Sequence, residues 1–112
     1  MVSAPPQSAS AAQITIRRNS PDDIQLRQIV VKLDRKRVAE LMYGDSATIS
    51  VAPGRRRLRV DNTWNWKTLD LDIAPGDHLK FLTINRAGRL TWFLIGTLGA
   101  GPIYVSIQPA PE

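Results

Sequence analysis

The sequence predicts an all-β protein, a single antiparallel β-sandwich of about seven to eight short strands. Apolar residues recur at every second position in short runs, such as Ala47, Ile49 and Val51, and this period is typical of a half-buried strand. Turn-forming dipeptides, among them Pro53-Gly54 and Pro75-Gly76, separate the runs. No long helical pattern interrupts the series, so we expect the strands to pack mainly against each other.

The strand-like runs follow one another along most of the chain, and in several of them apolar residues of one parity alternate with polar residues of the other. The clearest is Trp66–Ile73, where Leu69, Leu71 and Ile73 alternate with Thr and Asp. The predicted strands are a run around Ile14 and Ile16, Ile24–Leu33, Val38–Met42, Ala47–Val51, a run around Leu58 and Val60, Trp66–Ile73, His78–Ile84 and Ile103–Ile107.

The second of these runs, Ile24–Leu33, is irregular. Its apolar face is even-numbered before Gln28 and odd-numbered after it. A β-bulge or two separate elements would explain the change of phase. A helix also fits part of the run, but Arg37 and Glu40 would then fall on its apolar face, so a strand is favoured.

Length and composition indicate one globular domain. The 112 residues are 43% hydrophobic and 22% charged, which is close to the average for folded chains. We predict a flexible Ala/Ser/Pro-rich tail over residues 1–13, a β-sandwich over 14–108 and a short C-terminal tail over 109–112. The N-terminal residues lack the basic and apolar regions of a signal peptide, which predicts a cytoplasmic or membrane-associated protein.

Residues that carry chemistry are sparse. There is no cysteine, and His78 is the only histidine, so thiolate sites and His-rich metal motifs are excluded. Asp70 and Asp72 share a strand face, but the outward face of an amphipathic strand explains them. The glycine-rich segment 96–101 lacks the Lys of a phosphate-binding loop. We therefore predict no enzyme activity, no metal and no cofactor.

A basic and aromatic strip is the main candidate binding site. The net charge is +5, and Arg outnumbers Lys. Arginine side chains bind phosphates and carboxylates, and exposed tryptophans stack on bases or sugars. The alternative is that at least one tryptophan fills the end of the sandwich, covered by arginine side chains. The predicted ligand-binding residues are Arg55, Arg56, Arg57, Arg59, Trp64 and Trp66.

The C-terminal stretch from Leu90 to Pro111 carries no charged residue. A spanning helix needs about 20 apolar residues, but Gly and Pro cluster between residues 96 and 102. We interpret 90–98 as a buried strand or short helix. In the alternatives it is a spanning segment, or an exposed patch that contacts a partner or a membrane through Trp92, Phe93 and Leu94.

Between Val30 and Val60, strand-like runs are separated by turns at Asp34, Gly44 and Pro53-Gly54. This pattern resembles the PEGA-like group of small bacterial β-sandwich domains. That family alternates strands with an Asp-led turn, a Gly-polar turn and a Pro-Gly turn. The resemblance extends over roughly residues 14–84, although Arg35 stands where the family usually has glycine after the Asp. It implies an Ig-like or PEGA-like sandwich and a non-enzymatic module, often attached to envelope or membrane proteins. The matching residues are Val31, Leu33, Asp34, Val38, Leu41, Gly44, Val51, Pro53, Gly54, Leu58 and Val60.

Three functional hypotheses follow. The first is a non-enzymatic binding or interaction module of a bacterial protein, with a protein or an anionic partner. The second is a membrane-associated or self-associating domain, a homo-oligomer for example, that uses 90–98. The third is a weak binder of an anionic ligand or nucleic acid through the Arg/Trp strip, with nucleic acid as the less favoured ligand.

Overall fold

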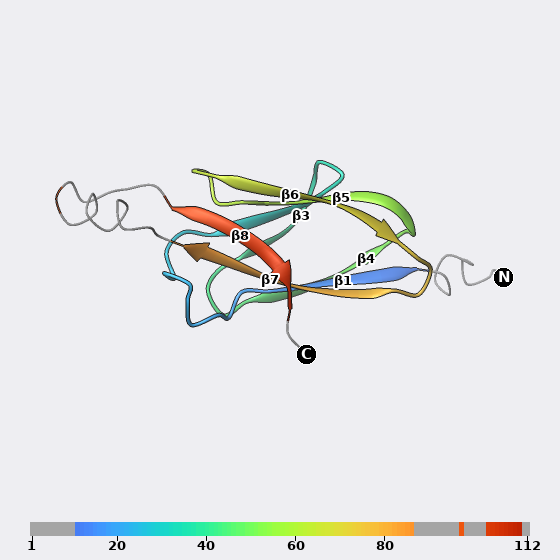
Figure 1. Cartoon of the computed structure of the whole chain (residues 1–112), viewed down its shortest axis with the longest axis horizontal. Helices are drawn as coiled ribbons and strands as arrows, with labels where there is room; N and C mark the ends of the chain where they lie inside the picture. The colour runs from blue at the N-terminus through green and yellow to red at the C-terminus, as the bar shows by residue number, and fades with distance from the viewer. Residues whose placement is uncertain (1–10, 87–96, 98–102, 111–112) are drawn as a thin grey trace.

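In the computed structural model, residues 11–86, 97 and 103–110 are described. In this part of the chain eight strands form two four-stranded sheets, in the orders β4-β1-β7-β8 and β3-β2-β5-β6 (Figure 1). The strands are β1 (Ala12–Arg17), β2 (Ile29–Leu33), β3 (Lys36–Leu41), β4 (Ser46–Val51), β5 (Gly54–Asp61), β6 (Trp66–Ile73), β7 (His78–Arg86) and β8 (Tyr104–Pro109).

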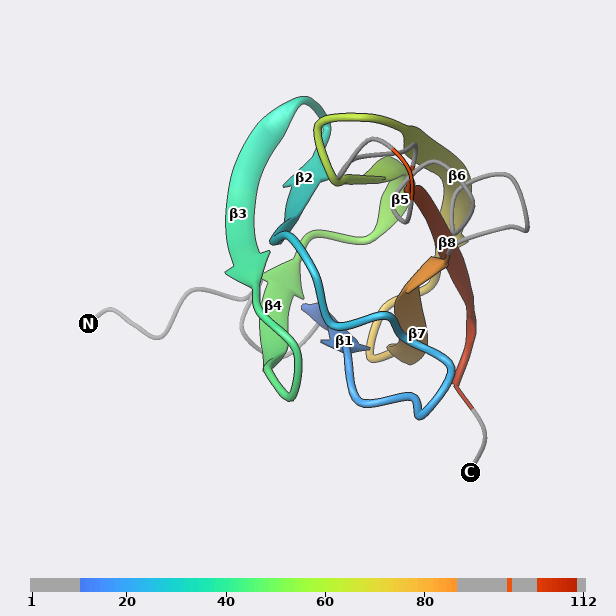
Figure 2. The same cartoon turned by 90° about the vertical axis from the view of Figure 1, so that its left-hand side faces the viewer.

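The two sheets face each other in a sandwich-like arrangement, and Figure 2 looks onto one end of it. Their edges also meet, because β3 contacts β4 and β6 contacts β8. The core lies between the sheets, where the period-two pattern places one apolar face of each strand. It consists mainly of Ile14 and Ile16 from β1, Ile29 and Val31 from β2, Leu58 and Val60 from β5, Ile73, Phe81 and Val105.

The all-β prediction is confirmed, but the sandwich is not purely antiparallel. β1 pairs with β7 in parallel, with Ile14 opposite Leu79 and Ile16 opposite Phe81. The strands between them lie in both sheets, so no hairpin links β1 to β7 and their relative direction follows from the crossover. Every other pair of neighbouring strands is antiparallel in the part of the chain that the structure describes.

The predicted strand Ile24–Leu33 is also corrected. Only Ile29–Leu33 forms a strand, and the residues from 24 to 28 belong to the irregular loop between β1 and β2. The alternative of two separate elements therefore holds for the change of phase near Gln28. A bulge does occur, but at Val31 and Lys32, which pair with Ala39 and Arg37 and leave Val38 unpaired.

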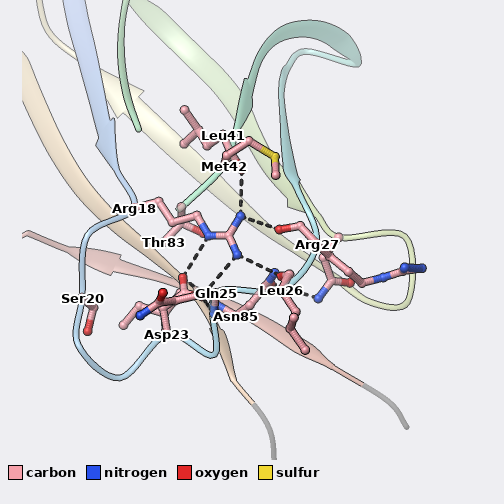
Figure 3. A network of polar contacts seen from close by, with 12 residues as sticks. Arg18, Ser20, Asp23, Gln25, Leu26, Arg27, Leu41, Met42, Thr83 and Asn85 are labelled. Carbon is pink, nitrogen blue, oxygen red and sulfur yellow. Dashed lines mark hydrogen bonds and ion pairs between the residues drawn. The ribbon is translucent and has the colours of Figure 1, made fainter. Parts of the chain in front are cut away.

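A buried polar network holds this β1–β2 loop against the end of the sandwich (Figure 3). Arg18 is completely buried, and its guanidinium donates to Asp23 at 2.9 and 3.2 Å. It also donates to the carbonyl oxygens of Leu26, Arg27 and Leu41. These acceptors satisfy all of the guanidinium nitrogens, as a buried charge requires.

Two buried amides extend the network to the opposite sheet. Asn62 donates through Nδ2 to Asn85 Oδ1 at 3.0 Å and to the Ile103 carbonyl at 2.9 Å. Its Oδ1 accepts from the backbone N–H groups of Trp64 and Asn65. Asn62 therefore fixes the β5–β6 loop, which carries Trp64, and joins it to β7 and to the start of β8.

Candidate functional site

Strand β5 splits the predicted arginine strip between its two faces. Leu58 and Val60 point into the core, so Arg55, Arg57 and Arg59 lie on the outer face of the β3-β2-β5-β6 sheet. Arg56 has the opposite parity and is half-buried. Its guanidinium donates to the Ala52 and Pro53 carbonyls and pairs with Asp34 at 3.3 Å. Arg56 therefore holds a turn and is not part of the outer face.

Strand pairing places further cations beside the arginines that were predicted from the sequence. Lys32 of β2 lies opposite Arg59 of β5 on one side and opposite Arg37 of β3 on the other. Thr68 of β6 continues this row beyond Arg59. Sequence reasoning missed Lys32 because its relation to Arg59 depends on strand register, and no local motif encodes that register.

Arg35 reaches the same face from the β2–β3 turn. Asp34 and Arg35 have φ angles of 50° and 72°, and turns with two positive φ angles favour Asn-Gly or Asp-Gly. Asp34 anchors the turn, because its N–H donates to the Arg57 carbonyl and its Oδ1 accepts from the Arg57 N–H, both at 2.8 Å. Arg35 thus occupies a position at which a residue with a side chain costs about 1–2 kcal/mol.

The cations surround a hollow in the outer face. A cavity of about 280 Å³ is lined by Lys32, Arg35, Arg57, Arg59 and Thr68. A wider depression of about 550 Å³ also includes Lys32, Arg35 and Arg59, and it extends to Arg37, Thr63 and Trp66. The two share one continuous basic surface, which we call the basic face and define as Lys32, Arg35, Arg57, Arg59 and Trp66.

Acidic neighbours neutralise only part of the basic face. Arg57 donates to Asp70 at 2.9 Å, and this hydrogen bond, with the opposite charge of Arg57, holds the pKa of Asp70 below its usual value. The same pair raises the pKa of Arg57. Arg59 lies 3.4 Å from Asp61. No described carboxylate lies within ion-pair distance of Lys32 or Arg35.

Arg59 has one buried polar atom without a partner in the described part of the chain and one close aromatic contact. Its Nε is buried and has no hydrogen-bond partner among the described residues, and buried donors of this kind are rare in folded proteins. Its guanidinium carbon lies 4.8 Å from the centre of the Trp66 ring, which is within cation–π distance. The indole thus holds a guanidinium that lines the hollow.

Both predicted tryptophans are exposed, Trp64 by 53% and Trp66 by 55%. The alternative that one of them fills the end of the sandwich is therefore wrong. They do not act as one pair, however. Trp64 lies in the β5–β6 loop and contacts Arg27 of the β1–β2 loop at 5.7 Å, whereas Trp66 belongs to β6 and the basic face.

The remaining predicted residues lie elsewhere. Arg55 is opposite Asp72, away from the hollow. Trp92, Phe93 and Leu94 lie outside the described residues. His78 Nε2 is 2.7 Å from Thr15 Oγ1 on the outer face of the other sheet. The described residues contain no group of three potential metal ligands, and none of their helices is long and apolar enough to cross a membrane.

Comparisons with known proteins found no similarity: no family model, curated protein or solved structure matches this chain. The function is therefore argued from the site itself. The basic face combines two cations that lack a paired carboxylate, the Arg59 guanidinium and an exposed indole. This set of groups suits a ligand that carries at least one anionic group and a flat or apolar part.

Proposed function

We propose that this protein is a non-enzymatic binding module whose basic face binds an anionic partner. One observation carries the proposal: Lys32, Arg35 and Arg59 surround one hollow, and Lys32 and Arg35 have no carboxylate partner in the described part of the chain. Three cations held close together repel one another. A bound anion reduces this repulsion and gives Lys32 and Arg35 a partner.

The groups around the hollow suit recognition of an oxyanion. Arg59 and Arg35 offer planar guanidinium groups that line the hollow, and Lys32 offers a mobile ammonium group. Charge-assisted hydrogen bonds of this kind contribute about 1.5–3 kcal/mol each. Because the face is open to solvent, we expect the affinity to fall as salt concentration rises.

The backbone at Arg35 supports a binding role. Glycine would adopt the φ of 72° without strain, yet the chain has arginine here, and its side chain lines the hollow. Strained positions of this kind are concentrated at functional sites.

For the finer fold, we propose a PEGA-like sandwich of the Ig-like class. The Asp-led β2–β3 turn and the Pro53-Gly54 turn before β5 support it, because both lie where the family pattern places turns. If the proposal is right, PEGA-like domains contain a parallel strand pair equivalent to β1–β7.

The experiment is a titration with inorganic tripolyphosphate at low ionic strength, followed by tryptophan fluorescence. The wild type is compared with a Lys32→Ala/Arg35→Gly double variant. We expect its affinity to fall by at least about ten-fold, the equivalent of one lost charge-assisted contact. Lys36→Ala/Lys67→Ala is the matched control, because it also removes two positive charges, at exposed positions that do not line the hollow.

Two results would overturn the proposal. One is wild-type affinity in the double variant. The other is an equal loss of affinity in Lys36→Ala/Lys67→Ala, which would indicate that only net charge matters. Because Trp66 lies beside Arg59, binding should also change its emission, and Trp66→Phe should remove that change.

A further inference from the structure

The large exposed apolar side chains of the described residues gather at one end of the sandwich. This is the end where β2, β6 and β8 begin and β7 ends (Figure 1). Isolated exposed apolar residues are common, but a cluster indicates an interaction surface. The residues are Leu26, Met42, Tyr43, Trp64, Trp66 and Tyr104, each at least 37% exposed.

Three of these residues lie in segments that buried hydrogen bonds tie together. The Leu26 carbonyl accepts from both Arg18 and Asn85. Trp64 donates its N–H to Asn62, whose side chain also binds the Ile103 carbonyl next to Tyr104. The backbone polar groups are thus satisfied while the apolar side chains face solvent. We call Leu26, Trp64 and Tyr104 the apolar tip.

The backbone around Leu26 is strained in a way that keeps the residue at the surface. Gln25 and Arg27, on either side of it, both have φ angles of 64°. Non-glycine residues in this conformation persist only where the surrounding structure enforces it, and here the Arg18 guanidinium binds the Leu26 and Arg27 carbonyls (Figure 3). These hydrogen bonds stabilise the strained backbone, and in this conformation the Leu26 side chain is exposed.

Cations accompany the aromatic rings. The Arg27 guanidinium stacks on Trp64 at 5.7 Å. Arg86 is the register partner of Tyr104 in the pairing of β7 with β8, and its Nε donates to Ser106 Oγ at 3.4 Å. Tryptophan and tyrosine favour the interface between lipid and water. Each Lys or Arg near an anionic membrane surface adds to the attraction. An indole with a guanidinium above it matches the boundary between acyl chains and lipid phosphates.

We propose that the apolar tip inserts into the interfacial layer of an anionic lipid membrane, with Arg27 and Arg86 facing the lipid phosphates. Leu26, Trp64 and Tyr104 do not line either hollow of the basic face, and they project from loops and a strand start. Projecting side chains suit insertion into a fluid layer, which needs no complementary shape.

The test is co-sedimentation with vesicles of phosphatidylcholine mixed with phosphatidylserine, compared with phosphatidylcholine alone. We expect the wild type to bind the mixed vesicles more tightly. A Leu26→Ser/Trp64→Ser double variant should bind them at least about ten-fold more weakly, because it loses two apolar side chains. Circular dichroism and the unfolding midpoint check that the variant remains folded. Leu26 and Trp64 take part in these hydrogen bonds only through their own backbone atoms, so both substitutions retain the bonds.

The two variants test membrane binding and tripolyphosphate binding independently. Lys32→Ala/Arg35→Gly should lose tripolyphosphate binding while its apolar tip still inserts, whereas Leu26→Ser/Trp64→Ser should keep tripolyphosphate binding. Trp66 is left unchanged because it belongs to the basic face. Quenching of Trp64 by brominated lipids, measured as the difference between wild type and Trp64→Phe, reports insertion directly.

Three outcomes would overturn the proposal. The wild type fails to bind either vesicle, the Leu26/Trp64 variant binds as well as the wild type, or brominated lipids quench Trp64 no better than ordinary lipids do. A wild type that sediments as a dimer without lipid, and a Leu26/Trp64 variant that sediments as a monomer, would assign the apolar tip to a second copy of the chain.

Discussion

Arg18 and Asp23 form an ion pair in the interior, with Nε and Oδ2 2.9 Å apart and both side chains fully buried. Asp23 also accepts from the Gln25 and Asn85 N–H groups. The pair thus links the end of β1, the β1–β2 loop and β7. The apolar tip depends on this pair, because Arg18 holds the loop that carries Leu26 and Arg27.

Removing one partner of this pair should destabilise the protein strongly. In Asp23→Asn the Arg18 charge stays buried without its counter-ion, which typically costs about 3–5 kcal/mol. The free energy of unfolding in urea measures the effect. Asp22→Asn is the control, because it makes the same change at the neighbouring exposed position. Equal stability of the two variants would contradict a structural role for the pair.

Asn62→Ala should lower the free energy of unfolding by at least about 2 kcal/mol. It leaves Asn85 Oδ1, the Ile103 carbonyl and two backbone N–H groups without their present partner, and each buried group left unsatisfied costs about 1–3 kcal/mol. Thermal unfolding measures the loss. Asn19→Ala, at an exposed position, should change the midpoint little, and a similar shift in both variants would refute the prediction.

Arg35→Gly should change stability and binding in opposite directions. Glycine removes the backbone strain at a φ of 72°. It also raises the conformational entropy of the unfolded chain, which offsets part of this gain in stability. The net stabilisation should be roughly 0.5–1 kcal/mol. Tripolyphosphate affinity should fall, because one cation leaves the hollow. Urea unfolding and titration on the same sample test both effects, and unchanged affinity would remove Arg35 from the site.

Asp70→Asn should increase tripolyphosphate affinity. Asp70 engages Arg57 at 2.9 Å, so its neutralisation frees a guanidinium that lines the hollow. Asp72→Asn makes the same charge change two residues along the same face, opposite Arg55, which does not line the hollow. We expect a several-fold gain in Asp70→Asn and a smaller gain in Asp72→Asn. Equal gains would indicate a general effect of net charge.

The Arg57–Asp70 ion pair predicts a pH dependence of the free energy of unfolding. Because Arg57 lowers the pKa of Asp70 in the folded protein, the ion pair contributes stability that is fully present above the unfolded pKa of about 4. That contribution is lost as the pH falls through the lower folded pKa. Asp70→Asn should therefore unfold less steeply with acid below about pH 4, and it should match the wild type in pH dependence between pH 5 and 8.

Much of the strand pattern was predictable because it is local. The alternation in Trp66–Ile73 coincides with β6, and the turn predicted at Pro53-Gly54 contains a glycine with a φ of 121°. The irregular run Ile24–Leu33 was harder to interpret. Its first part contains apolar Ile24 and Leu26, yet both lie in a loop that hydrogen bonds from the buried Arg18 hold in place.

The candidate site was predictable only in part. Arg57, Arg59 and Trp66 were found because they are close in sequence and belong to residue types that bind anions or stack on flat groups. Lys32 and Arg35 join them through the pairing of β2 with β5 and through a turn that sequence rules assign to glycine. Arg56 has the same local context as its neighbours, but its parity turns it toward Asp34 and the Ala52 carbonyl.

The amino-acid sequence by itself determined the all-β class and most of the strands, because an extended backbone exposes alternate side chains to core and solvent whatever its partners are. Tertiary structure alone decided the parallel β1–β7 pair, the burial of Arg18 with Asp23, and the clustering of Lys32 with Arg59. These relations join residues distant in sequence, and they depend on which strands pair and in which register, which side-chain periodicity does not encode.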